Sequence, residues 1–102
     1  MIEEGSWAPT GPATVLLDIG GDVGSLVVVT GPSLAGEEIE VESGSAVRIH
    51  TAVRERHMGA GVFHAAVFAG IPAGEWGLSV RGGSTRETVH ITGGGVLELD
   101  WR

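Results

Sequence analysis

Histidine side chains have the widest chemical range of any group in this chain, because imidazole binds metal ions and exchanges protons near neutral pH. Three of the four, His50, His57 and His64, follow one another at intervals of seven residues. On a helix this spacing places side chains on one face, but on a strand an odd separation alternates them between faces. Zinc also needs three or four ligands close together. We therefore interpret these residues as ordinary surface histidines and assign no metal site, with a site built from the three as the alternative.

Arginine supplies all six cations of the chain, and three of them cluster near the first of these histidines. This cluster is the candidate site for an anion, an acidic peptide or another ligand, and it contains Arg48, His50, Arg54 and Arg56. If residues 46–55 form one strand, Arg48, His50 and Arg54 share a face of it. The competing interpretation is a charged outer face balanced by the glutamates of residues 37–42, and we favour it.

Residues 37–42 and 46–55 both alternate apolar and polar side chains, as two strands of a hairpin do. Joining them through residues 43–47 sets acidic side chains opposite basic ones on the outer face. The pairs in this register are Glu42–Arg48, Glu40–His50, Val41–Ile49 and Ile39–Thr51. Opposite-charge cross-strand pairs stabilise a sheet by about 0.2–1 kcal/mol each. A slip of one residue would bury the glutamates, so the pattern fixes the register.

Catalytic motifs are not recognisable in this sequence. A nucleophilic triad needs a serine or threonine beside a histidine held by a carboxylate, and the best local candidate is the segment Asp22-Val23-Gly24-Ser25. It lacks the Gly-x-Ser-x-Gly elbow, and its glycines indicate a tight turn. The absence of lysine and cysteine excludes Schiff-base and thiolate chemistry. We assign no catalytic residues and no cofactor, and the sequence favours a protein that is not an enzyme.

Short segments rich in valine, isoleucine, leucine and threonine alternate with glycine-rich breaks from residue 13 onward. We expect strands at 13–19, 25–30, 37–42, 46–55, 62–68, 75–81, 86–92 and 95–101. Short strands separated by regular turn signals are typical of a sandwich or barrel. The sequence thus predicts an all-β fold, an antiparallel β-sandwich of seven to eight short strands. Residues 13–102 would form this single domain, after a flexible N-terminal arm at 1–12.

The inward face of residues 62–68 is left open by the sequence. If Phe68 points inward, strict alternation buries His64 with it; if Phe63 and Val67 point inward, His64 is exposed. A bulge would reconcile the two patterns.

The segment from Phe68 to Val80 reads Phe-Ala-Gly-Ile-Pro-Ala-Gly-Glu-Trp-Gly-Leu-Ser-Val. It resembles the Phe-x-x-Leu-Pro-x-Gly-x-Tyr-x-Leu-x-Val segment of prealbumin-like (transthyretin-like) sandwiches, such as carboxypeptidase regulatory-like and Cna-B-type domains. Ile71 and Trp76 stand where leucine and tyrosine are usual. Pro72 would stiffen the turn, Gly74 would supply a permissive backbone, and apolar side chains from Trp76 onward would share one face.

Downstream, residues 86–92, the glycine run 93–95 and residues 95–101 look like the closing hairpin of those folds. The resemblance covers residues 68–101 and implies a prealbumin-like sandwich. It implies no particular function, because this fold hosts carriers, hydrolases, adhesion stalks and regulatory domains. The purine-pathway hydrolase of this fold ends in a Tyr-Arg-Gly-Ser-type signature, whereas this chain ends Leu-Asp-Trp-Arg, so that activity does not carry over.

The net charge of −7 argues against nucleic acid or an anionic membrane as a partner, since both require neutralising cations. The first residues include two acids and no apolar stretch, so we expect no signal peptide. No apolar run is long enough to cross a bilayer. We therefore expect a soluble protein located in the cytoplasm.

These observations predict a non-catalytic binding or protein-interaction module that pairs with a protein partner, or with itself, through an edge strand. The low charge of residues 25–30 and 62–68 indicates a homodimer, through a shared sheet or packed faces. Trp7 is a candidate partner contact. The alternative function is a small hydrolase or ligand carrier with a His/Arg site around His50 and Arg54 at a subunit interface. Two histidines and a carboxylate meeting in a pocket would favour that alternative.

Overall fold

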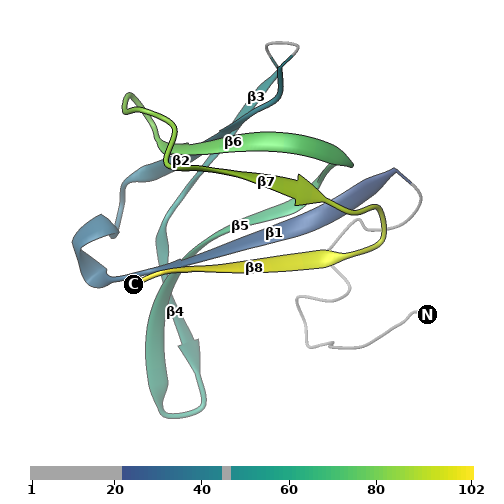
Figure 1. The fold of residues 1–102 in the computed structure, drawn as a ribbon. Helices are drawn as coiled ribbons and strands as arrows, with labels where there is room; N and C mark the ends of the chain where they lie inside the picture. Colours follow the sequence, from purple (N-terminus) through teal and green to yellow (C-terminus); the bar gives the residue numbers. More distant parts are fainter. Residues whose placement is uncertain (1–21, 45–46) are drawn as a thin grey trace.

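The computed structural model describes residues 22–44 and 47–102, and in these ranges nearly all regular structure is β-strand (Figure 1). The strands are β1 (Val23–Thr30), β2 (Glu38–Glu42), β3 (Arg48–Ala52), β4 (Arg54–Met58), β5 (Gly61–Pro72), β6 (Gly74–Val80), β7 (Glu87–Ile91) and β8 (Val96–Trp101). A short 3-10 turn, η1 (Pro32–Leu34), follows β1. The predicted all-β fold is confirmed. The predicted strand at 13–19, the arm at 1–12 and Trp7 lie outside the described residues.

Two four-stranded sheets form the structure, with strand orders β4-β5-β1-β8 and β3-β2-β6-β7. We call them sheet A and sheet B. Figure 1 shows β6 and β7 lying over β1 and β8, with the hairpin of β4 and β5 extending beyond the rest of sheet A. The inward side chains of both sheets meet in one sandwich-like core. Its buried members are Leu26, Val28, Ile39, Val41, Val53, Ala66, Phe68, Ile71, Trp76, Leu78, Val89 and Ile91.

The predicted hairpin of residues 37–42 and 46–55 is confirmed in its register. Glu42 pairs with Arg48, Glu40 with His50, Val41 with Ile49 and Ile39 with Thr51. The second strand is shorter than expected, however, because the chain leaves sheet B at Val53. Val53 exchanges backbone hydrogen bonds with residues 36 and 37 (2.9 and 2.8 Å) and is only 2% exposed. Residues 48–52 therefore form β3 in sheet B, and residues 54–58 form β4 in sheet A.

The predicted closing hairpin of residues 86–92 and 95–101 is wrong. β7 pairs with β6 in sheet B, whereas β8 crosses to sheet A and runs parallel to β1. The glycine turn between them binds the start of β1, since the Gly94 N–H donates to Val23 O (2.8 Å) and the Ser25 N–H donates to Gly95 O (2.9 Å). These hydrogen bonds hold the turn against β1, so β8 continues along β1 and does not fold back on β7. The sandwich is consequently antiparallel except at the pair of β1 and β8.

β5 settles the open question of its inward face. Ala66 and Phe68 are buried in the core, which places His64 on the same side, where it is partly buried. The pairing register of β5 with β1 then shifts between Gly24 and Leu26 of β1, so that Ile71 also turns inward. The pairing is regular over residues 62–68, so the bulge suggested there by the sequence is absent, and the register shift falls instead between Phe68 and Ile71.

The turn that follows β5 carries the chain from sheet A to sheet B. Gly74 has a φ of 134°, a conformation that favours glycine, as the sequence predicted. The Trp76 indole N–H reaches back and donates to the carbonyl oxygen of Pro72 (2.8 Å). Trp76 and Leu78 are buried and Val80 packs against the core, so the predicted shared face of β6 is confirmed.

Candidate functional site

The predicted cationic cluster is divided between the two sheets. Arg48 and His50 lie on β3 of sheet B, whereas Arg54 and Arg56 lie on β4 of sheet A. The expectation that Arg48, His50 and Arg54 share a strand face is thus wrong, because the strand ends where the chain changes sheets.

On sheet B, the two cationic residues are engaged by the neighbouring strand. Arg48 lies 3.6 Å from Glu40 and 3.3 Å from Glu42. The His50 Nδ1 lies 2.9 Å from the Glu38 carboxylate, which also accepts a hydrogen bond from Arg81 at 2.7 Å. The Arg81 hydrogen bond and the nearby charges together hold the pKa of Glu38 below its ordinary value. This face is an ion-pair network. Its cationic side chains already contact carboxylates of the same sheet, in the places where an external anion would bind.

On sheet A, Arg56 is the more buried of the two arginines. Its Nε donates to the carbonyl oxygen of Ala65 on β5 at 3.3 Å. Burial, followed by the charge of Arg54, lowers the pKa of the Arg56 guanidinium. Both arginines therefore belong to the surface of the β4–β5 hairpin.

The three evenly spaced histidines are also divided. His50 lies in sheet B, while His57 and His64 lie on β4 and β5 of sheet A. His57 Nε2 is 3.3 Å from Glu55, whose position on β4 pairs with that of His64. The His57 and Glu55 side chains are 67% and 60% exposed, so they meet on open surface rather than in a pocket. In the described ranges, no group of three histidines and carboxylates is placed to hold a metal ion.

The serine considered as a nucleophile is inaccessible. Ser25 is fully buried within β1, and its hydroxyl donates to the carbonyl oxygen of Ala69 at 2.5 Å. Gly24 lies inside β1 rather than in the expected tight turn. A side chain at Gly24 would overlap the carbonyl oxygen of Thr92, so the glycine permits the close passage of the β7–β8 turn.

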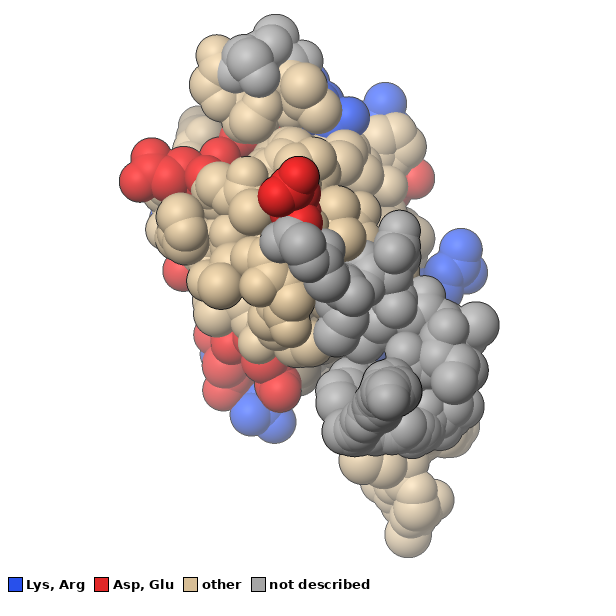
Figure 2. Space-filling model, turned by 90° about the vertical axis from the view of Figure 1, so that its right-hand side faces the viewer, with Lys and Arg blue, Asp and Glu red and all other residues tan. Residues whose placement is uncertain are grey.

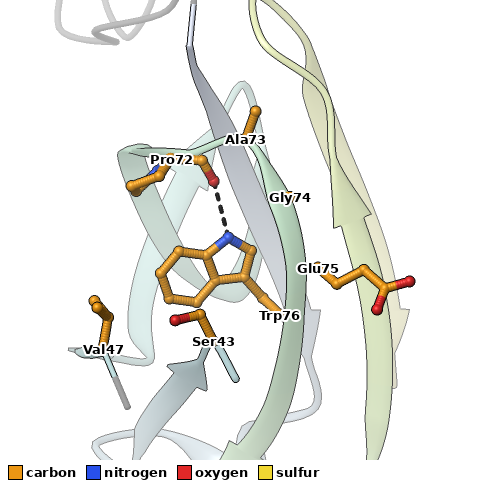
Figure 3. Close-up of a pocket in the computed structure, with 7 residues that line it drawn as sticks. All are labelled: Ser43, Val47, Pro72, Ala73, Gly74, Glu75 and Trp76. Atoms are coloured by element: carbon orange, nitrogen blue, oxygen red, sulfur yellow. Dashed lines mark hydrogen bonds between the residues drawn. The ribbon is translucent and has the colours of Figure 1, made fainter. Parts of the chain in front are cut away.

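One pocket of about 260 Å³ opens at the end of the sandwich where β5 turns into β6. It is lined by Ser43, Val47, Pro72, Ala73, Gly74, Glu75 and Trp76. Figure 3 shows the Trp76 indole forming one wall and the Glu75 carboxylate directed away from it. The Trp76 N–H is already bonded to Pro72. The pocket is thus lined by apolar side chains and by backbone. Its described lining contains no pair of side chains that could act as general acid and general base.

The four strands at the sheet edges differ in how they are protected. β4 carries charged or titratable residues at four successive positions, 54–57, and charged edges resist pairing with other chains. β3 carries the ion-paired Arg48 and His50. β7 exposes Glu87, Thr88 and His90. β8 is the most apolar edge, because Val96, Leu97, Leu99 and Trp101 make up most of it.

β8 offers unpaired backbone to an incoming strand. In a parallel ladder, alternate residues direct both backbone groups to the same neighbour. Ser25 pairs with Val96, and the Ser25 N–H donates to the carbonyl oxygen of Gly95. Residues 97 and 99 therefore also direct their backbone groups to β1. The N–H and C=O groups of Val96, Glu98 and Asp100 consequently point away from β1. No other described strand pairs with β8.

The side chains of β8 alternate in the same way. Leu97, Leu99 and Trp101 pack against the core but are only partly buried, because no described strand covers their outer side. Val96, Glu98 and Asp100 lie on the outer face of sheet A, and Val96 is 42% exposed. An added strand would complete the burial of the inward apolar row.

Polar contacts fix the end of β8 against β7. The Trp101 indole N–H donates to Glu87 at 2.7 Å, and the Arg86 guanidinium lies 4.2 Å from the centre of the Trp101 ring. Arg102 binds both oxygens of Asp100 (2.9 and 3.0 Å), and these hydrogen bonds lower the pKa of Asp100 to about 2. These contacts therefore hold the edge in place, with no described strand on its far side.

Sequence reasoning did not single out β8, because it assigned this strand to a hairpin with residues 86–92. Its alternation of apolar and acidic residues is visible in the sequence, but the free edge is not. Comparison with protein-family models, curated proteins and solved structures gave no match for the chain. Among the described residues, no helix has the length and apolar character needed to cross a membrane.

Proposed function

We propose that this protein is a non-catalytic interaction module that binds an extended segment of a partner protein along β8. The observation that carries the proposal is the half-covered row of Leu97, Leu99 and Trp101, beside a backbone edge that no strand of residues 22–44 or 47–102 pairs with. Addition of a strand supplies main-chain hydrogen bonds and buries alternate side chains, and both contribute to affinity. We further propose that the fold is prealbumin-like and the location cytoplasmic.

The strand order gives no support to a homodimer that shares a sheet at residues 25–30 or 62–68, and a homodimer through packed faces stays a prediction. Both segments belong to central strands, since β1 lies between β5 and β8, and β5 lies between β4 and β1. Their low charge is explained by that central position, where side chains are surrounded on both sides. β8 remains as the edge that favours pairing.

The alternative of a hydrolase or carrier has less support. It requires His50 and Arg54 to converge, and the two lie on different sheets. His57 contacts Glu55 on open surface, and His64 only occupies the paired position on β5. We therefore put forward the interaction module alone.

Hydrogen exchange in the unaltered protein is the first test. Because the amides of Glu98 and Asp100 point away from β1, we expect them to exchange much faster than those of Leu97 and Leu99. The measurement is amide exchange followed by NMR. Equal protection of all four amides would mean that the edge is already covered, and would overturn the proposal.

Peptide selection is the second test. A displayed library of random peptides is selected on the intact protein, and the binders are mapped by amide exchange. We expect binders to slow exchange at Glu98 and Asp100. Glu98→Pro removes an outward N–H without breaking the ladder to β1, so it should abolish binding, whereas Glu98→Ala keeps that N–H and should lose far less.

Thermal unfolding checks that both variants fold, and exchange mapping on the unaltered protein decides the question if the proline variant does not. A selection that returns no binder, or binders that protect other amides, contradicts the proposal.

A further inference from the structure

We infer that the segment bound along β8 is an alternating apolar and basic strand from another protein, with a basic residue opposite Glu98, rather than a second copy of this chain. This inference rests on the proposed function and specifies the chemistry of the partner. It follows from the charges on the outer face of β8.

Glu98 is the carboxylate of β8 that forms no ion pair in the described ranges, although the charge of Arg102 lies near enough to interact with it. Across β1 its position pairs with Val27, which in turn pairs with Val67 on β5, so the neighbouring outer-face positions are apolar. Asp100, by contrast, is bonded at both oxygens by Arg102. Within the described ranges, Glu98 forms no ion pair. A cation on an added strand would form a direct ion pair that Glu98 does not have within those ranges.

The chain as a whole also has more acidic than basic side chains. Figure 2 shows groups of acidic side chains, with cationic ones beside some of them, around a largely uncharged surface at the end of the sandwich where β7 turns into β8. The whole chain has a net charge of −7. A basic segment is therefore attracted to this edge, and an acidic one is repelled.

A second copy fits the edge poorly. An antiparallel pair of β8 strands must keep the apolar rows on the same side, which leaves few registers. The two registers that pair five of the six residues set Glu98 opposite itself or Glu98 opposite Asp100. Like charges directly opposite each other are destabilising. The charges of β8 thus disfavour self-pairing.

The same geometry defines the sequence of the partner. Residues of the added strand that lie opposite Leu97 and Leu99 face the core and must be apolar. The residue between them lies opposite Glu98 and is lysine or arginine. Apolar–basic–apolar is therefore the central motif.

Two matched synthetic peptides test this motif on the intact protein. One alternates valine and arginine and the other alternates valine and glutamate, so both have the same strand pattern and opposite charge. We expect the arginine peptide to bind at least about fivefold more tightly, since cross-strand charge pairs have effects of this size. Glu98→Lys should reverse the order, and binding is measured by fluorescence anisotropy at low salt.

The outcomes separate the two proposals. Binding of both peptides at β8 with equal affinity, or tighter binding of the glutamate peptide, overturns the inferred chemistry and leaves the interaction edge in place. Failure of both peptides, together with failure of the library selection, overturns the proposed function itself. Sedimentation velocity supplies the remaining test: a dimer that Glu98→Pro dissociates would show that the occupant is a second copy.

Discussion

Replacing Gly24 with alanine tests the crossing of the β7–β8 turn over β1. A Cβ at this position would overlap the carbonyl oxygen of Thr92, and it would lie 2.9 Å from Ile91 Cγ2 and 3.1 Å from the carbonyl oxygen of Gly95. Two of these three atoms belong to the backbone, so a change of side-chain rotamer cannot relieve the overlap. The turn would have to move away from β1, which strains the hydrogen bonds of Gly94 and Gly95 with that strand.

Overpacking of this kind costs about 1–3 kcal/mol. Alanine also reduces the entropy of the unfolded chain, which offsets about 0.4–1 kcal/mol. We expect a net loss of about 2 kcal/mol in the free energy of unfolding. With a urea dependence of about 1–3 kcal/mol/M, the unfolding midpoint should fall by about 1–2 M.

The matched control is Gly31→Ala. No atom lies within 4 Å of a Cβ placed at Gly31, and its φ of −80° suits any residue. This variant should be as stable as the unaltered protein or gain about 0.4–1 kcal/mol. Urea unfolding followed by tryptophan fluorescence measures both variants, since Trp76 is buried. If Gly24→Ala unfolds at the same urea concentration as Gly31→Ala, the turn does not cross β1 as described.

Three further changes give independent expectations. Trp76→Phe removes the hydrogen bond to Pro72 and part of a buried side chain, so the free energy of unfolding should fall by about 1–3 kcal/mol in urea titrations; an unchanged midpoint would contradict the assigned bond. Val53→Ala, at a site 2% exposed, should cost about 1–3 kcal/mol in the same assay, and a neutral effect would argue against its core position. Because folding lowers the pKa of Asp100 from 3.8 to about 2, its contribution to stability is present above pH 3.8 and is lost as the pH falls through 2. Thermal unfolding of Asp100→Asn should therefore vary less with pH across that interval, and an unchanged pH profile would count against the Arg102 contact.

The alternation of apolar and polar residues along the sequence was enough to predict part of the fold. The pattern of residues 37–42 and 46–55 was sufficient to predict the pairing of Glu40 with His50 and its neighbours, because any other register would bury charge. The face shared by Trp76 and Leu78 followed from the same period of two. These predictions succeeded because each depends on residues close together in the chain.

The candidate site could not be predicted in this way. The sequence shows that β8 alternates apolar and acidic residues, but it does not show which strand lies beside it. Adjacent segments with a glycine turn suggested a hairpin between β7 and β8, and the tertiary structure instead places β8 along β1. The prediction that the cationic residues share one strand face failed for a related reason. The chain changes sheets at Val53, and no glycine or proline marks this break in the sequence.

The sequence by itself therefore determined most of the described strand segments, the inward faces of residues 37–42 and 75–81, the acidic charge and the lack of a recognisable catalytic motif. Only the tertiary structure decided which strands are central, where the chain changes sheets and which edge is left free. The physical reason is that side-chain period is a local property, whereas strand pairing depends on backbone hydrogen bonds that every strand can form with any other. Burial of the whole core selects one set of pairings, and that selection leaves β8 with one face of its backbone unpaired.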